Sequence, residues 1–325
     1  MSPRNSPPIE GAPAVGVTAT FYPDTDDVRL EAALNTAEEW SEQELPLVMV
    51  DGSPDDKVAN AFRARGAFVL SARRLGIASQ RREGAEFVIA QGGNKIITLE
   101  PEKSMAHLAC KIATMLGDGD SKVDPSVVVI GRTEASKESM PPFQWRTEEL
   151  IGWLFKHILG MPADSLAGPR GYNRQGMQHL LDYPSDAPGM NNWLYMYYTV
   201  LAAMANGERV GEIKVDLIYP KSMVEQETDN LDFDRKRYEQ ARMQAHILLG
   251  KKSEAPQDYA AELQRIKLLN ELDDKKAVLR DMILKELTLM PKDPTIERIQ
   301  KFFDRVEAIA MLFGYKGGVD ADGPR

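Results

Sequence analysis

The chain is poor in cysteine and histidine: its 325 residues include one cysteine, Cys110, and four histidines. A single cysteine cannot form a disulfide within the chain, which indicates a reducing compartment, so we expect a cytoplasmic protein. Cys110 lies in an apolar helical stretch and is interpreted as a small core residue. The histidines are widely separated and match no zinc-binding spacing, so no structural zinc is expected.

Long apolar runs and excess positive charge are missing as well. No run approaches the roughly 18–20 apolar residues that span a bilayer, so no transmembrane segment is predicted. The formal net charge is −9, which gives no general field for binding nucleic acid. Neither a P-loop nor a Gly-x-Ser-x-Gly motif occurs, and this disfavours P-loop nucleotide hydrolases and α/β-hydrolases.

What the first part of the chain does contain is an alternation of short apolar runs with segments of helical periodicity. The runs are too apolar for strands with a wet face, so they predict an α/β fold with a mostly parallel sheet covered by helices. The five runs are Val15–Thr20, Leu45–Val50, Ala67–Ser71, Lys95–Leu99 and Ser126–Ile130.

The pattern changes after Arg132, where longer loops and aromatic helices follow. Polar loops are expected over 133–142 and 168–176, helices at Trp145–Leu159 and Asn191–Ala205, and a last strand at Gly211–Tyr219. From residue 230 onward the chain is predicted to be helical, beginning with Phe233–Leu249. The expected organisation is a disordered tail over 1–14, an α/β domain over 15–228, a helical extension over 229–314 and a second tail over 315–325.

The helical extension raises two questions of arrangement. Gln257–Met290 is either one long helix or a hairpin bent near Asp273, and Asp293 is the expected N-cap of the last helix, with Pro294 in its first turn. Both helices carry long apolar stripes that one surface does not cover. They therefore predict a homodimer or larger assembly through helices Gln257–Met290 and Pro294–Phe313.

Candidate ligand-binding residues follow the predicted strands, at the carboxyl edge where parallel sheets bind ligands. Asp51 ends a buried strand and precedes Gly-Ser, so its carboxylate can accept hydrogen bonds from a nucleoside; an ordinary helix N-cap is the alternative. Arg81 and Arg82 lie early in a helix, which suits a diphosphate or a solvated basic patch. Glu100 and Glu102 suit a divalent ion or an exposed turn.

The order of these features resembles the nucleotide-binding half of family 2-like glycosyltransferases of the GT-A fold, over about Val15 to Tyr219. The helix motif of that family, Gly-x-x-x-Ala-Arg-Asn-x-Gly, reads Gly76-Ile-Ala-Ser-Gln-Arg-Arg-Glu-Gly84 here. Glu100-Pro-Glu102 stands in the place of the metal-binding Asp-x-Asp.

The resemblance implies a role for each candidate residue. Tyr22, Asp24, Asp51 and Ser53 would hold the nucleoside, Gly76 and Arg81 the diphosphate, and Glu100 and Glu102 a Mn or Mg ion. Arg132, Arg170, Arg174 and Trp193 would contact the acceptor. The implied partners are a nucleotide-diphospho-sugar donor and a soluble acceptor.

Two departures from the family concern catalysis. The acidic pair that supplies the base in inverting members is replaced by Asn191-Asn192 before Trp193, and an amide cannot accept a proton. Asp182 and Asp186 lie just upstream and are the candidate substitutes, while retaining chemistry needs no such base. The histidine that many members use after the last strand is missing; Glu225 or Glu227 could serve instead, or the site uses no metal.

Three functions remain open on the sequence alone. The first is a glycosyltransferase that moves a sugar from a nucleotide-diphosphate donor to a soluble acceptor, with the leaving diphosphate stabilised electrostatically. The second is a catalytically degraded binding or scaffold protein on the same fold, which the paired asparagines favour. The third is a nucleotidyltransferase, although the Gly-rich basic signature expected after the first strand of such enzymes does not occur.

Overall fold

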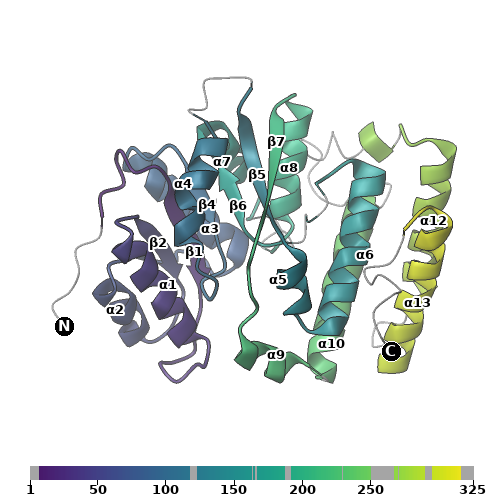
Figure 1. Ribbon diagram of the computed structural model, residues 1–325, viewed down its shortest axis with the longest axis horizontal. Coiled ribbons are helices and arrows are strands. Elements are labelled where there is room, and N and C mark those ends of the chain that lie inside the picture. The colour runs from purple at the N-terminus through teal and green to yellow at the C-terminus, as the bar shows by residue number, and fades with distance from the viewer. Residues whose placement is uncertain are drawn as a thin grey trace. The chain divides into compact units, whose positions relative to one another are not determined.

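The computed structural model describes residues 7–117, 123–162, 164, 167–186, 192–228, 230–249, 267–269, 271–289 and 295–315. These residues form two compact units (Figure 1). The first contains the described residues up to 131 and from 167 to 214, and the second contains those over 132–164 and from 215 onward. Each unit has its own core and is considered separately.

A seven-stranded mixed sheet organises the first unit, in the order β3-β2-β1-β4-β6-β5-β7. Strands β1 to β4 run parallel, and β6 is antiparallel to both of its neighbours, β4 and β5. The strands are β1 Val15–Thr20, β2 Leu47–Asp51, β3 Phe68–Ser71, β4 Ile96–Thr98, β5 Pro125–Arg132, β6 Arg170–Tyr172 and β7 Arg209–Val215. The predicted mostly parallel α/β sheet is confirmed.

Helices cover both faces of the sheet, as neighbouring strand residues show. Successive residues of a strand face opposite sides of the sheet. A Cβ atom on Gly16 would lie against Trp40 of α1, whereas the side chain of Val17 packs against Gly84 of α3. Helices α7 and α8 pack with α3 on its side. The helices of this unit are α1 Leu30–Glu42, α2 Asp56–Ala64, α3 Ile77–Ala90, the 3₁₀ turn η1 Ala106–Leu108, α4 Ala109–Met115, α7 Arg174–Asp182 and α8 Tyr195–Ala205.

Gly84 is the point of closest approach between α3 and the sheet. A Cβ atom there would collide with Cγ1 of Val17 and lie 3.3 Å from Cγ2 of Val50. Both valines are fully buried, so the sheet and helix would have to separate. We expect Gly84→Ala to lower the free energy of unfolding by about 1–3 kcal/mol, measured by urea denaturation. Lys57→Ala, at an exposed position on α2, is the control; a loss no greater than that of the control would contradict the prediction.

Some boundaries differ from those expected. β6 lies in a segment predicted to be a loop, and β7 ends at Val215 rather than at Tyr219. Of the predicted N-terminal tail, residues 1–6 lie outside the described part, but Ile9 is 4% exposed and Ala14 is fully buried. The ordered chain therefore begins before residue 15, because Ile9 packs beside Gly93.

The second unit is helical and includes more of the chain than the predicted extension. Helix α6 packs against α5, α10, α12 and α13, so residues after 132 join the C-terminal helices although the sequence suggested a boundary at 228. The elements are α5 Glu134–Glu138, α6 Pro142–Leu159, α9 Lys221–Glu227, α10 Leu231–Leu249, α12 Asp274–Leu289 and α13 Ile296–Leu312. Helix α5 lies in the expected loop over 133–142.

Two expectations about the C-terminal helices can be compared with the structure. Helix α12 begins at Asp274, and the side chain of Asp273 accepts the N–H of Lys276 at 2.9 Å. A new helix therefore starts where the hairpin alternative placed a bend. The N-cap of α13 is Thr295, whose hydroxyl accepts the N–H of Arg298; the expected Asp293 cap lies outside the described residues. Within the described ranges, no helix has the length and apolar character needed to cross a membrane.

Candidate functional site

Tyr22 joins the carboxyl ends of three parallel strands in the first unit. It follows β1, its N–H donates to the hydroxyl of Ser53 beyond β2 at 2.9 Å, and its own hydroxyl donates to Glu102 beyond β4 at 3.1 Å. The ring is 1% exposed, and Arg29 lies over it at 5.3 Å from the centroid. Burial and the nearby Glu102 carboxylate raise the pKa of Tyr22, so this hydroxyl stays protonated and acts as a donor.

Asp51 is the last residue of β2 and is nearly buried. One carboxylate oxygen, Oδ1, accepts hydrogen bonds from the hydroxyls of Thr20 at 2.8 Å and Ser53 at 2.7 Å. The second oxygen, Oδ2, has no hydrogen bond among the described residues. Asp51 is thus held rigidly with one acceptor atom available. Asp24, in contrast, is exposed and accepts the N–H of Asp26 in the loop after Tyr22.

Glu100 and Glu102 lie just past β4, as predicted. Glu102 is largely removed from water, and burial, followed by the charge of Glu100, raises its pKa above the ordinary value of 4.5. Glu100 forms an ion pair of 2.6 Å with Lys103. Its carboxylate also lies against Gly168, where a Cβ atom would collide with it. Two neighbouring carboxylates at a strand end, one of them strongly desolvated, form a site that favours a bound cation.

The start of α3 meets the same edge of the sheet. Gly76 precedes the helix at φ +122°, a conformation that favours glycine. The side-chain amide of Gln80 donates to the backbone oxygens of Thr20 at 3.0 Å and Val50 at 2.7 Å, while its oxygen accepts the N–H of Gly76. Gln80 therefore ties the helix to the ends of β1 and β2. The family motif has alanine at the position of Gln80, so the sequence did not predict this role.

Arg81 lies behind the site rather than at its surface. The side chain is 1% exposed, donates to the backbone oxygen of Leu99 at 2.7 Å, and contacts the hydroxyl of Tyr195. Its guanidinium also lies 5.2 Å from the ring centroid of Trp193. In this arrangement Arg81 holds the residue immediately before Glu100, and Tyr195 is a partner that sequence reasoning did not identify.

The acceptor and catalytic candidates of the first unit do not converge on one point. Arg170 is fully buried and donates to the backbone oxygen of Pro169 at 2.7 Å, whereas Arg174 is exposed on α7. Asp182 accepts a hydrogen bond from Gln178 at the end of the same helix. Asp186 is exposed and forms ion pairs with Arg74 and Arg82 at 2.6 and 3.6 Å.

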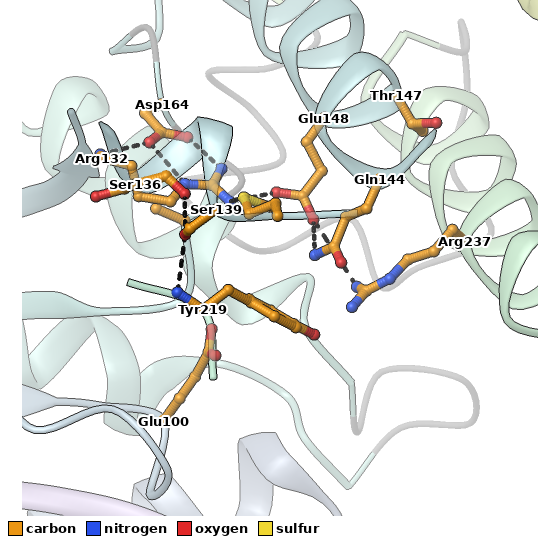
Figure 2. Close-up of polar contacts among 12 residues, drawn as sticks. Glu100, Arg132, Ser136, Ser139, Gln144, Thr147, Glu148, Asp164, Tyr219 and Arg237 are labelled. Carbon is orange, nitrogen blue, oxygen red and sulfur yellow. Dashed lines mark hydrogen bonds and ion pairs between the residues drawn. The ribbon is translucent and has the colours of Figure 1, made fainter. Parts of the chain in front are cut away.

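Arg132 belongs to the second unit, where it is the centre of a buried ionic network (Figure 2). Its backbone N–H, Nε and Nη2 all donate to Asp164, at 2.6–3.0 Å, and Nη1 donates to Glu148 at 2.7 Å. Gln144 donates to the other oxygen of Glu148 at 2.7 Å, and Arg237 lies 3.8 Å from that oxygen. Burial alone would lower the pKa of Arg132, but the two carboxylates outweigh it and raise the pKa.

Helix α5 positions the segment after β7 in the same unit. The hydroxyl of Ser136 accepts the N–H of Leu217 at 2.7 Å. The hydroxyl of Ser139 accepts the N–H of Tyr219 at 2.9 Å (Figure 2). These side-chain contacts replace the strand pairing expected up to Tyr219. Of the alternative metal ligands, Glu227 accepts the Tyr219 hydroxyl at 2.6 Å and Glu225 lies on α9, 3.9 Å from Lys221. In the described part of the chain, no three His, Cys, Asp or Glu side chains cluster in a way that would hold a metal ion.

No protein-family model and no curated protein matches the chain. It is similar to the solved mannosyltransferase from Pyrobaculum calidifontis in complex with GDP-Man and Mn²⁺, at 12% identity and a TM-score of 0.46, covering 97% of this chain and 85% of that one. It is also similar to glucosyl-3-phosphoglycerate synthase from Mycobacterium tuberculosis in complex with Mn²⁺, uridine diphosphate and phosphoglyceric acid, at 14% identity and a TM-score of 0.44, covering 70% and 76%.

A cytidylyltransferase from Leptospira borgpetersenii is similar at 9% identity and a TM-score of 0.37, covering 87% of this chain and 98% of that one. Identities and TM-scores this low assign no activity to the chain. The similar structures nevertheless include nucleotide-diphospho-sugar transferases of the GT-A type, the family that the sequence resembles.

Proposed function

We propose that the chain is a glycosyltransferase that binds a nucleotide-diphospho-sugar at the carboxyl edge of β1, β2 and β4 and transfers the sugar to a soluble acceptor. The observation that carries the proposal is the junction at Tyr22, which brings the Asp51–Ser53 turn and the two glutamates after β4 to one edge. In this proposal the nucleoside binds at the Asp51–Ser53 turn and the diphosphate binds near the two glutamates. The nucleoside and the diphosphate are adjacent groups of the donor, so one donor molecule could reach both positions.

Each group has a chemical role in this proposal. The available oxygen of Asp51 accepts hydrogen bonds from the nucleoside, and Tyr22, Asp24 and Ser53 shape that end of the site. Gly76 lets the start of α3 approach the diphosphate, where the first N–H groups of the helix point outward. Arg81 is proposed to act on the diphosphate end by fixing Leu99 and hence the position of the glutamates.

Glu100 and Glu102 would hold a divalent cation together with the phosphates of the donor. Mg²⁺ is commonly bound by one or two carboxylates plus substrate phosphates. Two glutamates would therefore suffice, although no larger group of metal ligands occurs among the described residues. When bound, the ion would neutralise charge on the leaving diphosphate. Lys103 pairs with Glu100 at 2.6 Å.

The acceptor end of the site is proposed to include Arg174 and Trp193. Arg170 is fully buried and would support the loop before β6, and Arg132 belongs to the ionic network of the second unit. Asp182 and Asp186 are the carboxylates proposed to accept the proton of the acceptor hydroxyl. In that step the hydroxyl oxygen bonds to the anomeric carbon, the nucleoside diphosphate leaves with the electron pair, and the proton passes to the carboxylate.

Thermal-shift measurements with UDP, GDP, ADP and CDP, each with Mn²⁺, Mg²⁺ or EDTA, test donor binding. A nucleotide at 100 times its dissociation constant should stabilise the protein by about 2.7 kcal/mol. One nucleotide that shifts the melting temperature supports the proposal and identifies the donors to assay. No shift at millimolar nucleotide would contradict it and favour the scaffold alternative, which the paired asparagines at 191–192 suggest.

Asp51→Asn tests the nucleoside contact directly. The amide can keep one oxygen toward Thr20 and Ser53, but it replaces the available acceptor by a donor. We expect nucleotide affinity to fall roughly 10- to 100-fold, with little change in the melting temperature of the free protein. Asp56→Asn, at an exposed position on α2, is the matched control. Equal nucleotide affinity in the two variants would show that Asp51 does not contact the nucleoside.

The nucleotidyltransferase alternative makes a different prediction about products. Incubation with a nucleoside triphosphate and a sugar phosphate would release pyrophosphate from such an enzyme, whereas a glycosyltransferase releases a nucleoside diphosphate from its sugar donor. Mass spectrometry of the products separates the two. Pyrophosphate release without nucleoside diphosphate release would overturn the proposed function.

We also propose that the C-terminal helices form a homo-oligomer. Leu289 at the end of α12 and Met311 and Leu312 at the end of α13 are 64%, 51% and 77% exposed, which leaves apolar surface on both helices. Light scattering at micromolar concentration should give at least twice the monomer mass of 36.2 kDa. A monomeric mass would contradict the proposal, and Leu312→Lys should lower the mass if these side chains form the contact.

A further inference from the structure

A cavity of about 230 Å³ opens beside α3 in the first unit, and its lining does not include Tyr22 or the two glutamates after β4. Three of its eight lining residues are arginines: Arg73 and Arg74 in the loop after β3, and Arg82 on α3. The others are Ser79, Ser185, Glu83, Glu86 and Asp186. Ser79 and Ser185 are buried, whereas the three arginine side chains are 32–70% exposed.

The carboxylates of this cavity are not equivalent. Glu83 and Glu86 belong to α3 and fix Arg73, whose N–H donates to Glu83 at 3.0 Å and whose side chain pairs with both glutamates. Glu86 also accepts from Arg82 at 3.2 Å. These contacts are local and orient the arginines.

Asp186 comes from a distant part of the chain, 112 residues beyond Arg74. It reaches across the cavity so that one oxygen lies 2.6 Å from Arg74 and the other 3.6 Å from Arg82. Its side chain is 74% exposed, and exposed ion pairs of this kind contribute little free energy. The Asp186 carboxylate therefore lies between two guanidiniums, at a position that suits an oxyanion, and its ion pairs there are weak.

We propose that this cavity binds the phosphate group of a phosphorylated acceptor, which replaces the Asp186 carboxylate between Arg74 and Arg82. A phosphate monoester carries up to two charges and three acceptor oxygens, so it can pair with both guanidiniums at once. The displaced Asp186 is then next to the acceptor, where it is available to accept the proton of the acceptor hydroxyl.

The role of the bound phosphate as part of an acceptor rests on the proposed function, but phosphate binding does not. Isothermal titration of the full chain with inorganic phosphate, at constant ionic strength and without nucleotide, tests the cavity alone. We expect Arg74→Ala and Arg82→Ala each to weaken binding roughly 10- to 100-fold. Asp186→Asn removes the internal competitor and should strengthen binding by up to about fivefold.

Arg63→Ala, an exposed arginine on α2 outside the cavity, is the matched control and should bind phosphate like the unmodified chain. Failure of phosphate to bind the chain and the Asp186→Asn variant would overturn the proposal, as would equal binding by Arg74→Ala and Arg63→Ala. Acetate titrated in the same way should bind more weakly, and acetate binding as tight as that of phosphate would overturn the phosphate assignment.

Sugar transfer then tests the acceptor role with the donor found by thermal shift. Phosphorylated polyols should give a glycosylated product and the same polyols after phosphatase treatment should not, and Arg74→Ala should raise the acceptor KM at least about 10-fold with an unchanged donor KM. Equal transfer to the dephosphorylated polyols would overturn this role. Failure of every nucleotide to bind would instead contradict the proposed function. It would not affect the conclusion on phosphate binding, which the titration tests separately.

Discussion

Arg132→Ala is expected to destabilise the helical unit by about 3–5 kcal/mol, the largest stability change that a single substitution should produce here. Arg132 is 7% exposed, and its guanidinium donates three hydrogen bonds to Asp164 and Glu148. Removing the guanidinium takes hydrogen bonds from two carboxylates in a buried environment, although Glu148 keeps Arg237 at 3.8 Å, and each carboxylate loses interactions that water cannot fully replace. Urea denaturation followed by far-ultraviolet circular dichroism measures the change.

Arg146 on α6 supplies a matched control in the same unit. It also pairs with two carboxylates, Asp304 at 2.7 Å and Glu307, but its side chain is 30% exposed. Arg146→Ala should therefore cost only about 0.2–1 kcal/mol per pair. Similar losses in the two variants would show that burial of the Arg132 network contributes nothing. The triple substitution Arg132→Met, Glu148→Gln and Asp164→Asn should recover most of the loss, because both carboxylates that paired with Arg132 are then neutral and Arg237, which loses Glu148, is 22% exposed.

The strands and the edge that they form could be predicted from the sequence, because both depend on local pattern. Continuous apolar runs identify buried strands, and Asp51 and Glu100 follow two of them directly. β6 could not be predicted in this way, since it has three residues and contains Gly171, and its pairing with β4 and β5 comes from distant parts of the chain. The packing of α6 against the C-terminal helices is likewise a tertiary contact, which no local sequence pattern indicates.

The position of Arg81 could have been inferred more closely from helical spacing. Ala78, Arg81, Ala85 and Val88 are three or four residues apart and thus share one face of α3, and all four are buried against the sheet side. Arg82, Glu83 and Glu86 lie on the neighbouring face, where the sequence suggested a diphosphate site or a solvated basic patch for Arg82. What the sequence could not reveal is Asp186, whose approach to Arg74 and Arg82 depends on how α7 packs against α3.

Glu102→Gln should weaken metal-dependent donor binding roughly 100-fold, a loss of about 3 kcal/mol, while making the free protein more stable at neutral pH. The amide keeps an oxygen for the Tyr22 hydroxyl but lacks the charge that a divalent cation requires. Thermal shifts with the identified nucleotide and Mn²⁺, with and without EDTA, measure the first effect. Glu31→Gln, exposed on α1, is the control and should leave metal dependence unchanged.

The stability effect follows from the raised pKa of Glu102. In the folded protein the carboxyl group ionises at a higher pH than its ordinary 4.5, so the unmodified protein loses stability as pH rises through that interval and stays less stable above it. Glu102→Gln does not ionise and avoids this loss. The variant should therefore unfold at higher urea concentration than the unmodified protein at pH 7, and the difference should disappear below pH 4.5, where Glu102 is protonated in both states. A gain in stability together with lost metal dependence would mean that Glu102 is kept ionised for binding at a cost to the fold, whereas lost stability at pH 7 would identify it as a structural partner of Tyr22.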